Sequence, residues 1–185
     1  VACTSSKARA TSSLPFQPQH FRSVQLVSHE MGHQFGAHHT FNGTTNGCGS
    51  AGQRNQATAF EPGSGSTMMS YAGLCVIENV QTAPDPYFHS GSIDAIIAYT
   101  TTGSGACGSA LMTGNGPPTV EAGPDYTIPH ETPFYLTGSG NDPDGDVLGY
   151  SWEQFDTGSA SSTVTPPSVD QGDNPLFRSF TPATR

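Results

Sequence analysis

The chain has 185 residues and is acidic, with 15 Asp and Glu against 6 Lys and Arg and a formal net charge of −9. Binding to a phosphate backbone needs clustered lysine and arginine, so this composition excludes a nucleic-acid partner. No run of eighteen apolar residues is present, and the sequence therefore predicts no membrane segment. Residues 1–116 contain five acidic and four basic residues (net −1), whereas residues 117–185 contain ten and two (net −8). This asymmetry indicates two regions of different character.

Cysteine usage indicates an oxidising compartment. The four cysteines include no Cys-x-x-Cys pair, which favours disulfides over a structural zinc site, with reduced cysteines in a cytosolic protein as the alternative. Lys7 is the one lysine, and Gly, Ser, Thr and Pro are abundant, as is typical of secreted or extracellular proteins. The chain opens at Val1 without a signal peptide, so we expect a fragment of a longer protein.

The first predicted element is a helix over about residues 20–35. Val24, Val27, Met31 and Phe35 recur at spacings of three and four, which gives one apolar stripe along a helix. We expect this stripe to pack into the core, with the histidines of the same helix turned toward a cleft.

The same helix leads into His29-Glu30-Met31-Gly32-His33-Gln34-Phe35-Gly36-Ala37-His38-His39, which fits the zinc template HExxHxxGxxH at every specified position. Residues four apart share a helix face, so His29 and His33 can bind one metal ion. Gly36 can take a positive φ that ends the helix and places His39 as third ligand. Glu30 lies at the edge of that face, where it can act as general base on a metal-bound water.

Three neutral imidazoles leave one open position on a tetrahedral zinc ion, which is typical of catalytic rather than structural zinc. Because zinc lowers the pKa of bound water to about 7, hydrolysis of a peptide bond is the expected reaction. His38 could compete with His39 as ligand, but the template spacing selects His39. Cobalt, nickel or copper would also suit the imidazoles, and a short helix with surface histidines is the non-functional alternative.

About thirty residues after His39 comes Ser66-Thr67-Met68-Met69-Ser70-Tyr71, preceded by small residues that can make a tight turn. With the zinc motif, this segment resembles the Met-turn of the metzincin clan, in which a methionine thioether lies beneath the metal. The resemblance implies that role for Met69, with Met68 as the alternative. It implies for Tyr71 a zinc contact or a hydrogen bond to the transition-state oxyanion, with packing behind the site as the alternative.

Features around the motif divide between two metzincin families. The sequence His39-Thr40-Phe41 is similar to pappalysins, whereas Cys3 and Cys107 are placed as in one disulfide of the reprolysin (adamalysin) family. Segments 61–66 and 85–89 resemble those of bacterial reprolysin-like members, our preferred match. The resemblance covers about residues 1–107. It implies an α+β fold made of the zinc helix, the Met-turn and a C-terminal helix, with the N-terminal sheet mostly missing and residues 1–3 as the tail of its edge strand.

Four cysteines allow three disulfide pairings. The reprolysin resemblance implies a bond between Cys3 and Cys107, and we predict the other between Cys48 and Cys75. This second bond would tie the loop after the zinc motif to the segment after the Met-turn, bracing two walls of the site.

Between and after these motifs the pattern is less regular. Residues 40–66 are rich in Gly, Asn, Ser and Thr, and predict an irregular loop without catalytic side chains. Residues 90–99 predict a helix, with Ser90 as its cap and apolar residues at 93, 96 and 97. His89 could be a fourth metal group, but a capping or packing role is commoner for such a histidine, and we do not assign it as a ligand.

A Gly- and Pro-rich linker at residues 113–118 divides a C-terminal part of a metzincin catalytic domain, residues 1–112, from a β domain at residues 119–185. Within the latter, residues 134–137 and 148–155 are aromatic and apolar segments that predict two strands joined by a turn. The region resembles a partial immunoglobulin-like sandwich of the polycystic-kidney-disease or cadherin-like kind.

Asp142, Asp144 and Asp146 place three carboxylates at alternate positions of the predicted turn, which suits a calcium ion. Val147 stands where an EF-hand loop needs glycine, so an ordinary Asp-rich turn in a solvated hairpin is the alternative.

The sequence thus predicts a secreted zinc-dependent endopeptidase, a hydrolase that acts as a monomer on a protein or peptide substrate. The alternative is a catalytically inactive adhesion or carbohydrate-binding protein that retains a metzincin-like scaffold. The presence of Glu30 favours the enzyme, because a scaffold without activity would be expected to lose the general base first.

Overall fold

The computed structural model of the protein describes Cys3 and residues 20–184. Of the predicted edge strand at residues 1–3, all but Cys3 lies outside the described residues. The elements are α1 (His20–Gln34), η1 (Asn46–Gly49), η2 (Gln56–Thr58), η3 (Val76–Glu78), α2 (Ser90–Thr101), β1 (Thr119–Glu121) and β2 (Ser139–Asn141). The fold is mixed α+β, and the sheet formed by the described residues has two strands, so the predicted sandwich is not observed. None of the described helices has both the length and the apolar character needed to cross a bilayer.

The chain separates into two compact units. The first comprises Val1–Gly108 and Ser151–Thr181, and the second comprises Ser109–Tyr150 and Pro182–Arg185. We call the second segment of the first unit, residues 151–181, the C-terminal strap. The proposed division into domains 1–112 and 119–185 stays a prediction, but the strap clusters with the unit that carries the zinc motif.

Helix α1 ends through a Schellman motif, as the glycine in the zinc template predicts. Gly36 has φ of +90°, its N–H donates to the His33 carbonyl, and the Ala37 N–H donates to the Gly32 carbonyl. This pair of bonds satisfies carbonyls that the last helical turn would leave unpaired, and only glycine takes the left-handed conformation without a Cβ penalty. The chain therefore turns sharply after Gln34 and runs back past the helix.

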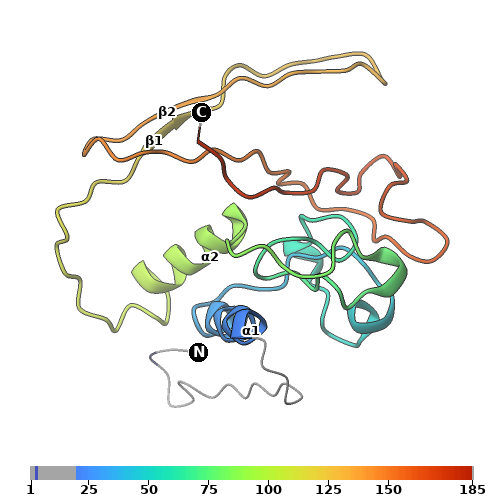
Figure 1. The fold of residues 1–185 in the computed structure, drawn as a ribbon, viewed down its shortest axis with the longest axis horizontal. Helices are drawn as coiled ribbons and strands as arrows, with labels where there is room; N and C mark the ends of the chain where they lie inside the picture. Colours follow the sequence, from blue (N-terminus) through green and yellow to red (C-terminus); the bar gives the residue numbers. More distant parts are fainter. Residues whose placement is uncertain (1–2, 4–19, 185) are drawn as a thin grey trace. The chain divides into compact units, whose positions relative to one another are not determined.

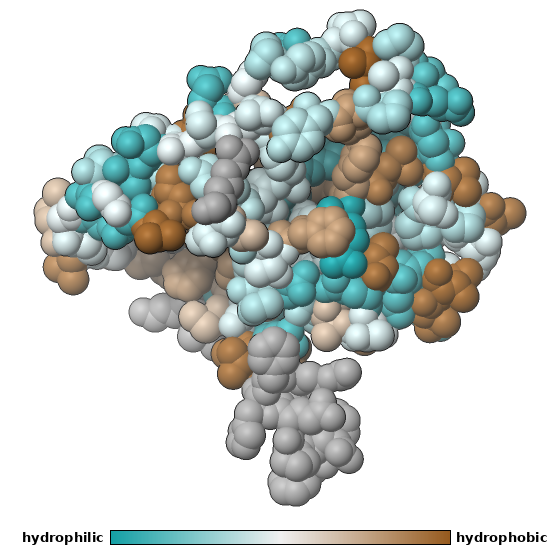
Figure 2. Space-filling view, turned by 45° about the horizontal axis from the view of Figure 1, so that its top comes forward, coloured by the Kyte–Doolittle hydropathy of each residue, from teal (hydrophilic) through white to brown (hydrophobic). Residues whose placement is uncertain are grey.

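The apolar stripe of α1 does not pack into a core. Val24, Val27 and Met31 are 62%, 51% and 54% exposed, so the prediction that this stripe would be buried is wrong for the described chain. Hydrophobic residues accordingly reach the surface in several places (Figure 2). The helix packs through other residues: Gln25 is buried and donates to the Pro84 carbonyl.

Between α1 and α2 the chain is mostly irregular (Figure 1), as predicted for residues 40–66. Its core is small: Phe41, Cys48 and Cys75 form a buried cluster against which Tyr71 packs. Phe41 also forms an isolated parallel bridge with Glu61. With so little apolar packing, covalent bonds and buried hydrogen bonds carry a large share of the order in this region.

Both predicted disulfides are confirmed. Cys3 pairs with Cys107 and Cys48 with Cys75, closing sequence separations of 104 and 27 residues, and the described cysteines include no free thiol. The second bond lies in the buried cluster and joins η1 to the residue that precedes η3.

Replacing both Cys48 and Cys75 with alanine is expected to lower the free energy of unfolding by about 3 to 4 kcal/mol. The reason is that the unfolded chain regains the conformational entropy that the disulfide removes by closing a loop of this length. The measurement is urea unfolding with and without reductant. Reductant should destabilise the unaltered protein more than the variant, and equal losses in both would contradict the assignment.

Helix α2 begins differently from the prediction. Its N-cap is His89, whose Nδ1 accepts from the Gly91 N–H, and the Ser90 N–H donates instead to the Glu153 carboxylate. The His89 ring is fully buried and stacks on Phe60 at a centroid distance of 5.2 Å. The prediction that Ser90 caps the helix is therefore wrong, and His89 has the capping and packing role.

The C-terminal strap is hydrogen-bonded along the loops of the first unit, and Figure 1 shows it in orange and red beside them. Side chains of those loops donate to strap carbonyls in four places: Asn42 to Ser159, Thr44 to Ser161, Arg54 to Gly158, and Ser66 to Ser179. In the other direction, the Arg178 guanidinium donates to the Gln81 side chain. The strap thus behaves as part of the first unit.

In the second unit β1 pairs antiparallel with β2, with Val120 opposite Gly140. The predicted strands at 134–137 and 148–155 are not formed as strands, because pairing begins just after the first segment and touches the second only at a bridge between Tyr150 and Ala183. Asp142 begins a tight turn, and its side-chain Oδ1 accepts hydrogen bonds from the backbone N–H groups of residues 144 and 146.

Candidate metal centre

The three template histidines converge on one point. His29 and His33 lie one turn apart on α1, and His39 returns to them after the Schellman turn. Nε2 of His39 lies 3.1 Å from Nε2 of His29 and 3.0 Å from Nε2 of His33. Among the described residues, these three histidines form the one group of at least three His, Cys, Asp or Glu side chains that lie close enough together to hold a metal ion.

The outer nitrogen of each ring bonds to a backbone carbonyl. Nδ1 of His29 donates to the Met68 carbonyl at 2.8 Å, and Nδ1 of His33 donates to the Ala37 carbonyl at 2.8 Å. Nδ1 of His39 donates to the Gln53 carbonyl at 2.6 Å. These bonds fix the neutral tautomer that has its lone pair on Nε2. Three lone pairs facing one another at this separation repel unless a cation lies between them.

The donor set fits zinc. Tetrahedral zinc with Zn–N bonds of about 2.0 to 2.1 Å places two ligand nitrogens roughly 3.3 Å apart, close to the two separations observed here. Burial adds to the fit: desolvation lowers the pKa of His29 and lowers that of His39 to about 4, with smaller effects of the neighbouring charges. Both rings are therefore unprotonated at neutral pH, the form that binds a metal.

This burial predicts a pH dependence for the metal-free protein. Because His39 has a pKa of about 4 when folded and about 6.5 when unfolded, the unfolded chain binds more protons between these values. Stability is therefore expected to be fully present above pH 6.5 and to fall progressively toward pH 4. Urea unfolding of chelator-treated protein at pH 7.5 and 5.0 measures this, and His39→Ala should reduce the difference between the two. An unchanged difference in that variant would contradict the assignment.

Met69 packs against α1 at Gly32. Its side chain is fully buried, and a Cβ built on Gly32 would meet its sulfur at 2.5 Å. Gly32 therefore lies between the two helical ligands because only a residue without a side chain lets the thioether approach the helix. Met68 has a different place: its carbonyl accepts from His29, and its side chain lines the adjoining cavity.

Tyr71 lies beside His39. Its ring centroid is 4.5 Å from that of His39, and its hydroxyl donates to the Gln53 side chain at 2.6 Å. Burial and, to a smaller extent, the charge of Glu30 raise the Tyr71 pKa, so the phenol stays protonated and can donate a hydrogen bond. Sequence reasoning missed Gln53, which holds both Tyr71 and His39.

A cavity of about 380 Å³ opens beside His29 and Glu30. Its wall is largely apolar and includes Leu26, Met68, Ala72, Leu74, Ala83 and Pro84. Ser70 and Tyr71 line it as well. The site thus combines a polar cluster of three histidines that could hold a metal ion with a neighbouring apolar cavity.

Other candidate residues are not brought to the centre. His38 is exposed and does not belong to the converging trio. His89 is occupied as a helix cap. The structure lends the calcium prediction no support: Asp142 accepts backbone N–H groups within its own exposed turn, which is what an ordinary Asp-rich turn does.

The converging imidazoles, the carboxylate of Glu30 in the cavity wall and the buried Met69 form an arrangement that fits a zinc metallopeptidase. Comparison with protein families supports this: residues 3–94 match the model of the reprolysin-like metallopeptidase family M12B. The match spans the zinc motif and the Met-turn and supports a metzincin-type peptidase domain. The match ends at residue 94, before the predicted immunoglobulin-like region at residues 119–185. No curated protein and no solved structure matches the chain.

Proposed function

We propose that this protein is a secreted zinc-dependent endopeptidase that hydrolyses peptide bonds with Glu30 as general base. The observation that carries the proposal is the convergence of three Nε2 atoms, each on a ring oriented by a backbone carbonyl, beside Glu30 and an apolar cavity. Zinc bound to His29, His33 and His39 would supply Lewis-acid activation of water and of the scissile carbonyl.

The chain's own residues would carry the proton. The Glu30 carboxylate follows His29 on α1 and lines the same cavity, and its charge influences His29 and Tyr71. From this place it would take a proton from the attacking water and deliver it to the leaving amine. The phenol of Tyr71 would donate to the developing oxyanion, after exchanging its bond to Gln53 for the substrate.

The cavity would determine which substrate side chain is accepted next to the scissile bond. Its apolar wall would accept one side chain next to the scissile bond, and Leu74 and Ala72 would contact it. We therefore expect an apolar residue of the substrate at this position, because a charged side chain would lose its hydration there without gaining a partner.

An extracellular location suits this activity. Two disulfides in a peptidase unit with a small apolar core indicate folding in an oxidising compartment. We propose accordingly that the enzyme acts outside the cell, as a monomer, on proteins or peptides.

The test joins metal analysis to proteolysis. The protein should contain close to one zinc ion per chain and cleave a mixed peptide library, with cleavage stopped by chelator and restored by added zinc. Stoichiometric zinc without chelator-sensitive cleavage of any peptide would leave the inactive metzincin-like scaffold as the better description. A protein that takes up no zinc at neutral pH would refute both the enzyme and the metal centre.

A further inference from the structure

Glu61 is a charged residue buried beside the metal centre, and the zinc template does not include it. Its side chain is 1% exposed and lies among hydroxyl and backbone N–H groups. Oε1 accepts from the N–H of Ser66 and of Thr67 at 2.8 and 3.0 Å. Oε2 accepts from the hydroxyls of Thr40 and Thr67 at 2.5 and 2.6 Å.

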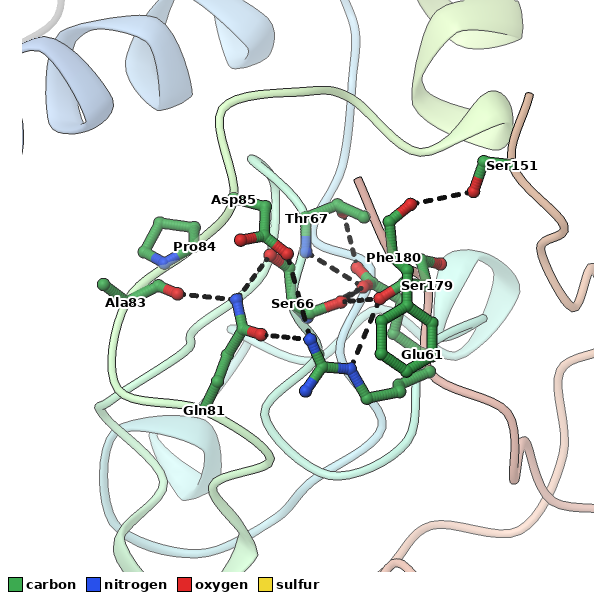
Figure 3. Close-up of polar contacts among 12 residues, drawn as sticks. Glu61, Ser66, Thr67, Gln81, Ala83, Pro84, Asp85, Ser151, Ser179 and Phe180 are labelled. Carbon is green, nitrogen blue, oxygen red and sulfur yellow. Dashed lines mark hydrogen bonds and ion pairs between the residues drawn. The ribbon is translucent and has the colours of Figure 1, made fainter. Parts of the chain in front are cut away.

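The carboxylate of Glu61 is surrounded by hydrogen-bond donors. All of these neighbours donate, and an ionised carboxylate is a pure acceptor with room for about four hydrogen bonds. The Ser66 hydroxyl lies between Glu61 and the strap carbonyl of Ser179, at 3.2 and 3.0 Å, so its proton is shared (Figure 3). No ion pair between Glu61 and a cationic side chain is found among the described residues, and the hydrogen bonds replace the lost hydration.

The donors belong to the segments that orient two metal ligands. Thr40 directly follows His39. Thr67 directly precedes Met68, whose carbonyl accepts from Nδ1 of His29. The same carboxylate therefore holds the residue after one ligand and the residue before the group that orients another.

The backbone doubles this link. The Glu61 N–H donates to the Thr40 carbonyl, and the Glu61 carbonyl accepts from the Asn42 N–H. The Thr40 N–H in turn donates to the carbonyl of Met69 in the Met-turn. A rotation of the Met-turn relative to His39 would break charge-assisted bonds in a place that water does not reach.

We propose that Glu61 is a positioning residue of the metal centre, which acts through Thr40 and Thr67 to hold His39 and the Met-turn in the geometry that binds zinc. The proposal rests on the proposed zinc site. It assigns Glu61 no contact with zinc or substrate.

Glu78 provides a matched comparison within the same unit. It is also 1% exposed, and its Oε2 accepts from the backbone N–H groups of Thr44 and Thr45 at 2.8 and 2.6 Å. These donors precede η1 and are not adjacent to a ligand or to a carbonyl that orients one. Loss of either carboxylate should therefore destabilise the fold, whereas only loss of Glu61 should disturb the metal centre.

The experiment compares Glu61→Gln with Glu78→Gln. Glutamine keeps the size of the side chain but replaces one acceptor with an N–H₂ donor. Backbone N–H groups cannot turn to accept, so the new donor must face the hydroxyls of Thr40 and Thr67, and these must reorient. Zinc affinity is measured by competition with a chromophoric chelator, and ligand geometry by the visible spectrum of the cobalt-substituted protein.

Glu61→Gln is expected to weaken zinc binding about tenfold, the lower end of the effect of losing a group bonded directly to a metal ligand, because Glu61 acts through Thr40 and Thr67, and to shift the cobalt bands. Glu78→Gln should leave both unchanged. If Glu61→Gln does not fold, Thr67→Val, which removes one donor at nearly constant volume, is expected to produce a smaller shift of the same kind. Unchanged zinc affinity and spectrum in whichever of the two variants folds would overturn the proposal. Failure of the unaltered protein to bind zinc would instead refute the proposed function.

Discussion

Glu30→Gln is expected to lower kcat/KM for peptide cleavage by about 10²- to 10⁴-fold, the usual contribution of a general base. Glutamine has almost the size of glutamate but cannot take a proton. Because Glu30 does not belong to the converging trio of His29, His33 and His39, zinc content should stay the same. The measurement is steady-state cleavage of a fluorogenic peptide by protein whose zinc content has been determined.

Two controls make this result specific. Zinc analysis of the same samples shows that the loss is not a loss of metal, and Glu30→Asp, which keeps the acid on a shorter side chain, should retain more activity than Glu30→Gln. Activity of Glu30→Gln within a few-fold of the unaltered protein, at equal zinc content, would exclude Glu30 as the base.

His39→Ala is expected to weaken zinc binding by more than about 100-fold, the upper range for loss of an outer partner, because a direct ligand is removed. His29 and His33 alone would leave the ion with two protein ligands. Activity should be lost in parallel and should return only in part at high zinc concentration.

His38→Ala is the matched control, because it removes the same side chain from the adjacent position. His38 is exposed and lies outside the converging trio, so its removal should leave zinc affinity unchanged. The reverse result, with zinc lost in His38→Ala and kept in His39→Ala, would mean that the template spacing selects the wrong histidine.

The sequence by itself determined the metal-binding geometry, because that geometry is local. A spacing of four places His29 and His33 on one helix face whatever surrounds the helix. A glycine three residues later allows the left-handed turn that returns His39 to them, and the structure has this turn at Gly36. The disulfide pairing was also predicted correctly, with the Cys3–Cys107 bond taken from the resemblance to reprolysins.

Only the tertiary structure decided what surrounds those ligands. Every residue has a carbonyl, so nothing in the sequence could single out those of Met68 and Gln53 as the groups that orient two of the imidazoles. The same holds for Glu61, whose hydroxyl and N–H partners are common residues brought together by irregular loops.

Helical periodicity had a further limit. It identified the apolar stripe of α1 correctly but could not show whether another element covers it, and Val24 and Val27 are exposed. Composition along the chain groups residues 151–181 with the preceding residues of the predicted β domain, a division that stays a prediction. Composition could not show that the strap is hydrogen-bonded to residues more than 100 positions away, such as Ser66 to Ser179. Periodicity and composition describe one segment at a time, whereas the partner of a segment depends on how the whole chain folds.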